Sequence, residues 1–233
     1  MISVAILGSG NVATHLYTAF SKAANISVTQ FNSRKLSTIT SSDVTIIAVS
    51  DDAIQQVSQE IKNRNGLIVH TSGAVDINAI AGNRKGVFYP LQSFTKNAII
   101  NFNEIPFCLE TSHKEDFILL ENVAKSIGNK IYQIDSEQRK KLHVAAVFVN
   151  NFTNHMYTIA SDICEKNNVP FEFLYPLIEE TAKKIQSILP KDAQTGPAKR
   201  NDVQTIQNHL ENLNLQQQKI YELLTKSIQN SIE

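Results

Sequence analysis

Near the start of the chain stands the stretch Ile2-Ser3-Val4-Ala5-Ile6-Leu7-Gly8-Ser9-Gly10-Asn11-Val12-Ala13, residues 2–13. The apolar run up to Leu7 predicts a buried strand, and the residues from about Asn11 predict a helix. Between them lies G-x-G-x-x-A, in which the first glycine permits a tight turn, the second leaves room for a pyrophosphate, and the small third residue lets helix and strand approach. Free N–H groups at such a helix start attract phosphates. The stretch predicts a dinucleotide site that uses Gly8, Ser9, Gly10, Asn11, Val12 and Ala13, and an ordinary tight turn is the alternative.

Alternation of strand and helix patterns continues through residue 134. Further strands are expected over 26–31, 44–49, 67–71, 87–89, 107–109 and 130–134, with helices from 52 and over 113–127. Such alternation is typical of crossover units and a mainly parallel sheet covered on both faces. We therefore expect an α/β, Rossmann-type NADP-binding domain over residues 1–135.

The pattern changes in residues 136–233, where no convincing strand is found. One long helix is expected over 136–167, capped by Asp135 or Ser136. Helices over 170–189, 202–213 and 215–232 follow, with a loop over 190–197. This half is predicted to be a smaller all-helical C-terminal domain for substrate binding and dimerisation. Because its helices are apolar on more than one face, we expect a homodimer.

Composition narrows the class of protein. Lys and Arg total 22 and Asp and Glu total 22, so the net charge is zero and the bulk attraction for nucleic acid or an anionic membrane is missing. No apolar run approaches the roughly 20 residues that cross a bilayer, and the first residues lack the basic region of a signal peptide. The two cysteines, Cys108 and Cys164, match no metal-binding spacing. We expect a cytoplasmic protein with no metal, no nucleic-acid partner and no membrane anchor.

The end of the second expected strand bears on the choice of cofactor. Asn32, Ser33 and Arg34 follow Phe31, and no Asp or Glu occurs before Asp43. NAD-binding domains place a carboxylate at this point for the ribose 2′-hydroxyl. Arg instead grips a phosphate with two parallel hydrogen bonds. These residues favour NADP over NAD, and a solvated basic turn is the alternative.

Two other expected strands end in polar residues. The end of one is formed by Val49, Ser50 and Asp51, and the end of the next by Thr71 and Ser72. Ligands of open α/β sheets bind beyond the carboxyl ends of the strands. These five residues are therefore predicted to contact the cofactor, although helix capping and turn formation are also suitable roles.

The long expected helix carries a polar stripe on an apolar segment. Residues 142–151 are apolar around most of the circumference, which predicts burial on all sides. His143, Asn150 and Asn154 share one face, and Asn151 and His155 form a neighbouring pair. Buried polar groups need partners, so the stripe is either a substrate site or a set of hydrogen bonds between helices.

A loop near the end of the chain offers a second polar feature. Lys199 and Arg200 precede an expected helix start, which suits an anionic ligand. A solvated loop between helices is the alternative.

These segments together resemble a known family. Residues 8–13, Tyr89-Pro90-Leu91-Gln92-Ser93, residues 143–157 and residues 195–202 are similar to the family with a Rossmann-like domain and the C-terminal domain of unknown function 2520. That family lies in the 6-phosphogluconate dehydrogenase superfamily, beside the pyrroline-5-carboxylate reductases and the F420-dependent NADP reductases. The resemblance spans almost the whole chain. It implies NADP in the first domain, a helical domain like the C-terminal part of 6-phosphogluconate dehydrogenase, and an oxidoreductase whose substrate it does not supply.

One position departs from the related β-hydroxyacid dehydrogenases. Those enzymes carry a lysine one helical turn before the second Asn of an Asn-Asn pair, and here Val147 stands four residues before Asn151. Reduction of an imine that is already protonated suits such a site, and hydride exchange with a deazaflavin stays open. His143 is the candidate acid, Asn150 and Asn151 are candidates for holding the substrate or the cofactor carboxamide, and Arg200 is a candidate for an anionic substrate group.

The expected function is an NADP-dependent oxidoreductase. It would transfer hydride to or from a small imine or carbonyl substrate bound between the two domains. The alternative is a non-catalytic NADP-binding sensor or interaction protein. The missing lysine favours the alternative, and the retained histidine and asparagine stripe disfavours it.

Overall fold

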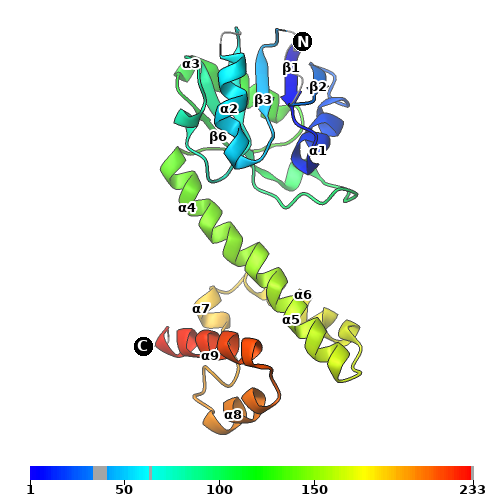
Figure 1. Cartoon of the computed structure of the whole chain (residues 1–233), viewed down its shortest axis with the longest axis vertical. Helices are drawn as coiled ribbons and strands as arrows, with labels where there is room; N and C mark the ends of the chain where they lie inside the picture. Colours follow the sequence, from blue (N-terminus) through cyan, green and yellow to red (C-terminus); the bar gives the residue numbers. More distant parts are fainter. Residues whose placement is uncertain (34–40, 63–64, 232–233) are drawn as a thin grey trace. The chain divides into compact units, whose positions relative to one another are not determined.

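The computed structural model describes residues 1–33, 41–62 and 65–231 (Figure 1). The chain forms two compact units, Met1–Asn151 and Phe152–Glu233. Arg34, one of the residues expected to bind the cofactor, lies outside the described residues.

A seven-stranded sheet forms the centre of the first unit, with the strand order β2-β1-β3-β4-β5-β6-β7. Neighbouring strands are parallel except for β5 and β6, which are antiparallel. This confirms the mainly parallel sheet expected from the alternating pattern. The strands are β1 (Ile2–Leu7), β2 (Ile26–Phe31), β3 (Val44–Ile47), β4 (Leu67–His70), β5 (Lys85–Pro90), β6 (Pro106–Thr111) and β7 (Lys130–Gln133).

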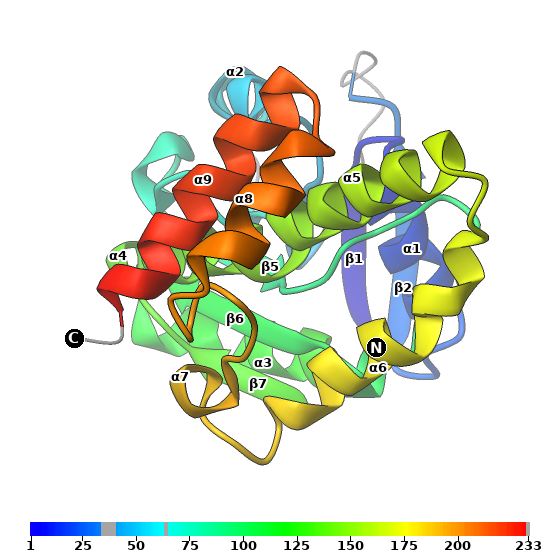
Figure 2. The same ribbon diagram turned by 90° about the horizontal axis from the view of Figure 1, so that it is seen from below.

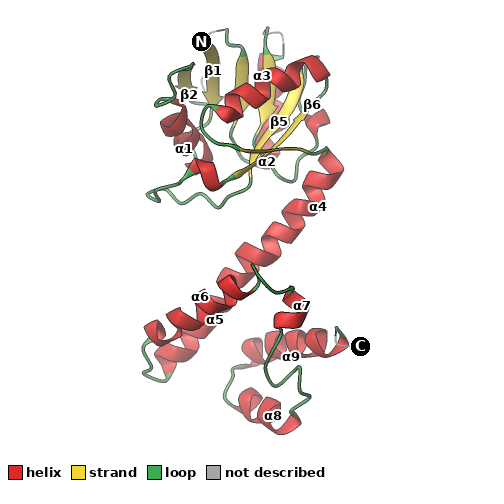
Figure 3. Ribbon diagram, turned by 180° about the vertical axis from the view of Figure 1, so that it is seen from behind, coloured by secondary structure: helices red, strands yellow, loops and turns green. Residues whose placement is uncertain are grey.

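Helices cover both faces of this sheet. Helices α1 (Asn11–Phe20) and α3 (Lys114–Lys125) pack on one face, and α2 (Asp51–Ile61) packs on the other. Figures 1 and 3 view the sheet from opposite sides, with α2 in front in the first and α3 in front in the second. Successive side chains of a strand point to opposite faces, so Ile46 joins the core under α1 while Ile47 joins the core under α2.

Helix α4 (Ser136–Ala146) begins where the sheet ends. The Asp135 side chain accepts a hydrogen bond from the Gln138 backbone and the Gln138 side chain accepts one from the Asp135 backbone, so Asp135 is the expected cap. Leu142 packs against a third apolar cluster that includes Tyr89 of β5. The change from sheet to helices thus falls next to residue 135, whereas the compact units divide after Asn151.

The long helix differs from its expected form in two ways. It passes through a π-helical segment, Val147–Phe152, before continuing as α5 (Thr153–Lys166). Burial on all sides is not found within the single chain, where Val144, Phe148 and Val149 are 58%, 61% and 72% exposed. Leu142 on one side of α4 packs against the sheet, and these three side chains lie on the part of the helix surface that the sheet leaves exposed.

The second unit is helical, and its described residues 152–231 contain no strand (Figure 3). Helices α8 (Val203–Glu211) and α9 (Leu215–Asn230) lie side by side (Figure 2), with His209 Nδ1 2.8 Å from the Tyr221 hydroxyl. The expected loop over 190–197 contains one helical turn, which Pro190 starts because its fixed φ suits the first helical position. The helices after α5 are the 3₁₀ turn Phe171–Leu174, α6 (Tyr175–Lys184), α7 (Pro190–Ala193), α8 (Val203–Glu211) and α9 (Leu215–Asn230). None of the helices in the described ranges is long and apolar enough to span a bilayer.

Candidate functional site

The loop between β1 and α1 is held in place by its first glycine. Gly8 has φ +141°, and a Cβ there would lie 2.1 Å from the Ala48 carbonyl oxygen. Its N–H donates to the Phe31 carbonyl at 3.0 Å, and its own carbonyl accepts from Gln30 Nε2 at 2.8 Å. The loop is therefore fixed to β2 and pressed against the end of β3.

The start of α1 is open. Gly10 is the N-cap residue, with φ −77°, and no side chain caps the helix. A Cβ at Gly10 would meet nothing within 4 Å. Ala13 is fully buried in the core, where its small side chain permits the helix to approach the sheet. The uncapped N–H groups and the positive end of the helix dipole suit an anion, and Gly10 leaves the approach unobstructed.

A cleft of about 830 Å³ lies in front of this loop. It brings together nine of the residues predicted for the cofactor: Gly8, Ser9, Gly10, Asn11, Val12, Ser33, Val49, Ser50 and Thr71. The described residues Ala13, Asn32, Asp51 and Ser72 were also predicted, and they do not line it. The lining is completed by residues that the sequence analysis did not predict for the cofactor: Ala48, Gln92, Phe94, and Ala53, Gln56, Val57 and Glu60 of α2.

Two of the predicted cofactor residues that do not line the cleft have structural roles, and their contact with a cofactor stays a prediction. The Ser72 hydroxyl accepts from the backbone N–H groups of Ala74 and Val75, both at 3.1 Å, and so shapes the turn after β4. Asp51 is the first residue of α2, where the helix dipole stabilises its negative charge. Ser50 is the N-cap residue of that helix.

A segment after β5 crosses over α1. The Asn11 amide donates to the Phe94 carbonyl at 2.9 Å, and His15 Nε2 lies 2.8 Å from the Thr95 carbonyl. These two bonds hold the segment against the helix that starts at the open cleft. Asn11 thus shapes one wall of the cleft in addition to lining it.

A second cavity, of about 530 Å³, lies between the end of β5 and the long helix. Gln92 lines both this cavity and the first cleft, so the two adjoin at this residue. The cavity brings together His143, Asn150 and Asn151 of the predicted stripe with Tyr89, which the sequence reasoning did not select. The rest of the lining consists of Leu91, Ser93, Leu142, Ala145, Ala146, Val147 and Val149. None of the described residues that line the cavity is Asp, Glu, Lys or Arg.

Tyr89 and His143 form a pair at one wall of this cavity. The Tyr89 hydroxyl lies 3.1 Å from His143 Nδ1. A Cβ at Gly73 would lie 2.6 Å from His143 Nδ1 and 2.7 Å from Tyr89 Cζ. Only glycine at position 73 therefore leaves room for the pair. Burial raises the pKa of Tyr89 to about 12, so its hydroxyl keeps its proton at neutral pH.

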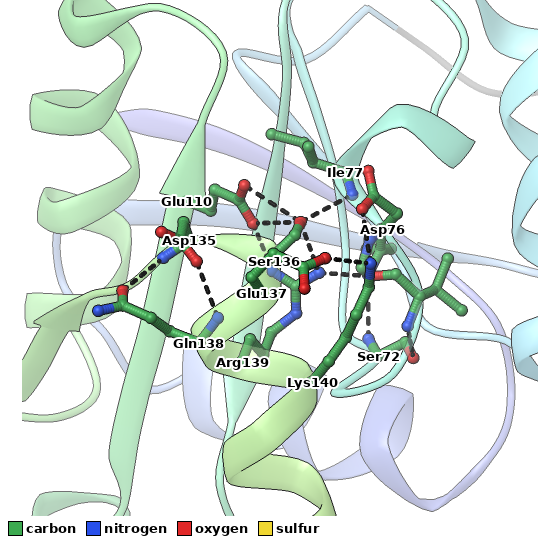
Figure 4. A network of polar contacts seen from close by, with 12 residues as sticks. Ser72, Asp76, Ile77, Glu110, Asp135, Ser136, Glu137, Gln138, Arg139 and Lys140 are labelled. Carbon is green, nitrogen blue, oxygen red and sulfur yellow. Dashed lines mark hydrogen bonds and ion pairs between the residues drawn. The ribbon is translucent and has the colours of Figure 1, made fainter.

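The first turn of α4 is fixed by a buried ionic network (Figure 4). Arg139 has a fully buried side chain that pairs with Glu110 of β6 and donates to the Val75 carbonyl. The Ser136 hydroxyl donates to Glu110 at 2.8 Å and accepts from the Ile77 N–H at 3.1 Å. The network ties α4 to the end of β6 and to the turn after β4. It fixes the helix one turn before His143.

His70 ends β4 and is fully buried. Its Nδ1 accepts from the Ser72 N–H at 3.1 Å, which leaves the ring proton on Nε2. Burial, and then the nearby charge of Arg139, lower the pKa of His70 to about 4. The ring is therefore neutral at neutral pH.

The remaining predicted residues lie in the second unit. Asn154 and His155 are exposed on α5. Arg200 is exposed, with its guanidinium 3.9 Å from the Asp202 carboxylate. Asp202 caps α8 by accepting from the Thr205 N–H at 3.1 Å. The loop with Arg200 is thus built as predicted, and its role in binding stays a prediction.

Comparisons with known proteins support this reading of the fold. The family model described as "Domain of unknown function (DUF2520)" matches residues 105–228. A Bacteroides fragilis protein provisionally described as an NADP oxidoreductase is 37% identical, with a TM-score of 0.90 and 98% of each chain covered. No curated protein matches the chain.

More distant structures share the fold. Plasmodium falciparum pyrroline carboxylate reductase, solved with NADP bound, is 15% identical with a TM-score of 0.58, and the match covers 100% of this chain and 98% of that one. A Streptomyces aurantiacus imine reductase is 12% identical with a TM-score of 0.62, over 90% of this chain and 86% of that one. These likenesses confirm the predicted Rossmann-type domain followed by a helical part.

Proposed function

The chain belongs to the family defined by the domain of unknown function DUF2520, and we propose that it is an NADP-dependent oxidoreductase. The proposal is supported by the Bacteroides fragilis protein, which is similar over 98% of both chains and is provisionally described as an NADP oxidoreductase. When bound, NADPH supplies a hydride, and the protein supplies the site that orients it.

The observation that carries the proposal is the contrast between Gly8 and Gly10. At Gly8 the missing side chain is required by the fold, because a Cβ would meet the Ala48 carbonyl at 2.1 Å. At Gly10 the fold has room for a side chain, because a Cβ would meet nothing within 4 Å and φ is −77°. Glycine at position 10 is therefore explained by a ligand that passes over the open start of α1. A pyrophosphate fits this place.

The preference for NADP rests on the end of β2. Ser33 lines the cleft, and no carboxylate stands between Phe31 and Asp43. Glu60 also lines the cleft, but it belongs to α2 rather than to the strand end where NAD-binding domains hold the ribose. Asn32, Ser33 and Arg34 are proposed to bind the 2′-phosphate.

Titration calorimetry with NADPH and NADH tests the cofactor assignment. We expect tighter binding of NADPH, and Arg34→Ala should remove most of the difference, about 1.5–3 kcal/mol for a charged contact. Gly10→Ala should lose NADPH binding while its melting temperature stays that of the wild type. Equal affinity for the two cofactors contradicts the NADP assignment. Unchanged NADPH binding by Gly10→Ala contradicts the proposed place of the pyrophosphate.

The substrate is proposed to be a small imine or carbonyl compound in the second cavity. Gln92 joins this cavity to the cofactor cleft, so a reacting group there adjoins the bound cofactor. Asn150 and Asn151 offer amides to the substrate or to the cofactor carboxamide, and Arg200 is retained as a partner for an anionic substrate group. A non-catalytic sensor would bind NADPH without oxidising it in the presence of any such compound. The adjoining cavity, with its titratable pair, favours the enzyme.

We further propose a homodimer. Ala198 is the one buried apolar residue among the described residues of the second unit, whereas Phe173, Leu177 and Leu215 are among its exposed apolar side chains. A helical unit of this size needs an apolar core to be stable. A second copy of the chain is the proposed cover for these faces and for the exposed side of α4. The two free cysteines support the cytoplasmic setting expected from the sequence.

A further inference from the structure

We propose that Tyr89 is the proton donor of this site, that His143 replaces the proton it loses, and that the reacting group of the substrate is an uncharged C=O or C=N. The inference rests on the proposed NADP-dependent function, which it makes more specific. It changes the role expected for His143, because the imidazole then acts through Tyr89 and not directly on the substrate.

Tyr89 lies at the edge of the sheet that carries the cofactor cleft. Tyr89 stands near the end of β5, which runs parallel to β4, so it lies at the same edge of the sheet as Thr71 of the cofactor cleft. Tyr89 lines the second cavity together with Gln92, the residue that also lines the first. Its hydroxyl is therefore beside the place where cofactor and substrate are proposed to meet.

The lining of the cavity also suits proton donation by Tyr89. Of the described residues that line the second cavity, Tyr89 and His143 carry the side chains suited to proton transfer, and none is Asp, Glu, Lys or Arg. A substrate group that gains negative charge during reduction can receive a proton from this pair. The same uncharged lining, with its leucine, alanine and valine side chains, suits a reacting group that is neutral before reduction.

The arrangement of the pair suits the same role. A hydroxyl that gives up its proton needs a partner that stabilises the phenolate and returns a proton, and His143 Nδ1 lies 3.1 Å away. Burial raises the pKa of Tyr89 to about 12, which keeps the hydroxyl protonated before the reaction. Gly73 leaves the space that the two rings occupy, and the buried Arg139 network fixes α4 one turn earlier. These contacts hold both rings in one geometry.

The proposed step transfers one hydride and one proton to the substrate. Hydride from NADPH forms a C–H bond at the carbon of C=O or C=N, the π electron pair moves to the oxygen or nitrogen, and NADPH becomes NADP⁺. The Tyr89 O–H proton passes to that oxygen or nitrogen, and the protonated His143 returns a proton to Tyr89 from Nδ1. Neutral His143 then takes a proton from water. The sum is substrate plus NADPH plus one proton, giving reduced substrate plus NADP⁺.

Two probes separate proton donation from other roles. Cyclopentanone needs both hydride and a proton, whereas the N-methylpyrrolinium ion, a ring of the same size, needs only hydride because its nitrogen keeps a permanent charge until it is reduced. The wild type, Tyr89→Phe and His143→Gln are compared by NADPH oxidation with each probe. Tyr132→Phe is the matched control, since it removes the hydroxyl of an exposed tyrosine on β7 that does not line the cavity.

We expect Tyr89→Phe to slow turnover of cyclopentanone by about 10²–10⁴-fold, the usual range for a general acid. Turnover of N-methylpyrrolinium should fall by less than about tenfold, because that reaction has no proton to place. His143→Gln should show the same selectivity, and Tyr132→Phe should match the wild type with both probes. Equal losses with the two probes would mean that Tyr89 only binds substrate or supports the fold, which overturns the inference.

The remaining outcomes separate this inference from the function on which it rests. Wild-type protein that binds NADPH and reduces N-methylpyrrolinium but not cyclopentanone overturns the proton donor and leaves the oxidoreductase standing. NADPH binding without reduction of either probe overturns the substrate class and the donor. Failure to bind NADPH at all overturns the proposed function itself.

Discussion

Arg139 and Glu110 form an ion pair inside the first unit, with the arginine side chain fully buried and the glutamate 15% exposed. The pair joins the first turn of α4 to β6, and Arg139 Nε has no hydrogen-bond partner among the described residues. Removal of either charge leaves the other buried and uncompensated.

We predict that Arg139→Leu or Glu110→Leu lowers the free energy of unfolding by about 3–5 kcal/mol, measured by urea denaturation. The double variant Arg139→Leu/Glu110→Leu should lose less unfolding free energy than the two single variants lose when their losses are added. Lys125→Ala breaks an exposed pair with Glu121 on α3 and should cost less than about 1 kcal/mol. A buried-pair variant that costs no more than this control refutes the prediction.

Gly73→Ala is predicted to damage the Tyr89–His143 pair without changing the cofactor site. The added methyl would lie 2.6 Å from His143 Nδ1 and 2.7 Å from Tyr89 Cζ, so one or both rings must move. Gly73 does not line the cofactor cleft. NADPH affinity, measured by calorimetry, should therefore stay within about twofold of wild type while cyclopentanone turnover falls at least about tenfold. Cyclopentanone turnover by the double variant Tyr89→Phe/Gly73→Ala should be no slower than by Tyr89→Phe alone. A further loss of turnover would show that Gly73 acts by another route.

His70 is predicted to make stability depend on pH below neutrality. Its pKa is about 4 in the folded protein and about 6.5 when unfolded, so the unfolded state takes up a proton first as the pH falls. The free energy of unfolding is therefore unaffected by His70 above about pH 6.5. It falls progressively as the pH drops towards 4, by on the order of 3 kcal/mol in total. Urea denaturation across this window should show the loss in wild type and a smaller one in His70→Gln. Parallel pH dependence of the two proteins contradicts the assignment.

The proposed homodimer should be weakened by a charge on the exposed side of α4, which carries Val144. Val144→Glu places a carboxylate on that side, where 58% of the valine is exposed in the single chain. Light scattering at micromolar concentration should give a dimer mass for wild type and a lower mass for this variant. Ile118→Glu on α3 is the matched control, 65% exposed in wild type, and should stay dimeric. A monomeric wild type rules out the dimer.

Local signals in the sequence predict the strands and the cofactor loop well. The apolar run to Leu7 and the glycines at 8 and 10 carry their structural meaning within a few residues, because burial and turn geometry are set there. Asp135 was identifiable as a cap for the same reason, since its partner Gln138 is three residues away.

The second cavity depends on distant contacts that no local pattern reports. Tyr89 and His143 are 54 residues apart in sequence, and their approach depends on how α4 packs on β5. Arg139 gave no signal either, because an arginine in the first turn of a helix is usually exposed. The residues Tyr89 to Ser93 did contribute to the family resemblance, and that was the available hint that Tyr89 has a role.

The π-helical segment Val147–Phe152 has a consequence for how this helix tolerates length changes. A π turn holds one more residue than an α turn, so removal of a single residue there can return the helix to regular α geometry. Each residue of an α-helix advances the direction of its side chain by about 100°. Because Asn150 and Asn151 lie within the wide turn, a one-residue deletion there would change their directions relative to His143, although every one of these side chains would still be present. The spacing of the stripe is set by the wide turn as much as by the amino acids themselves, so a deletion there should be more harmful than most substitutions.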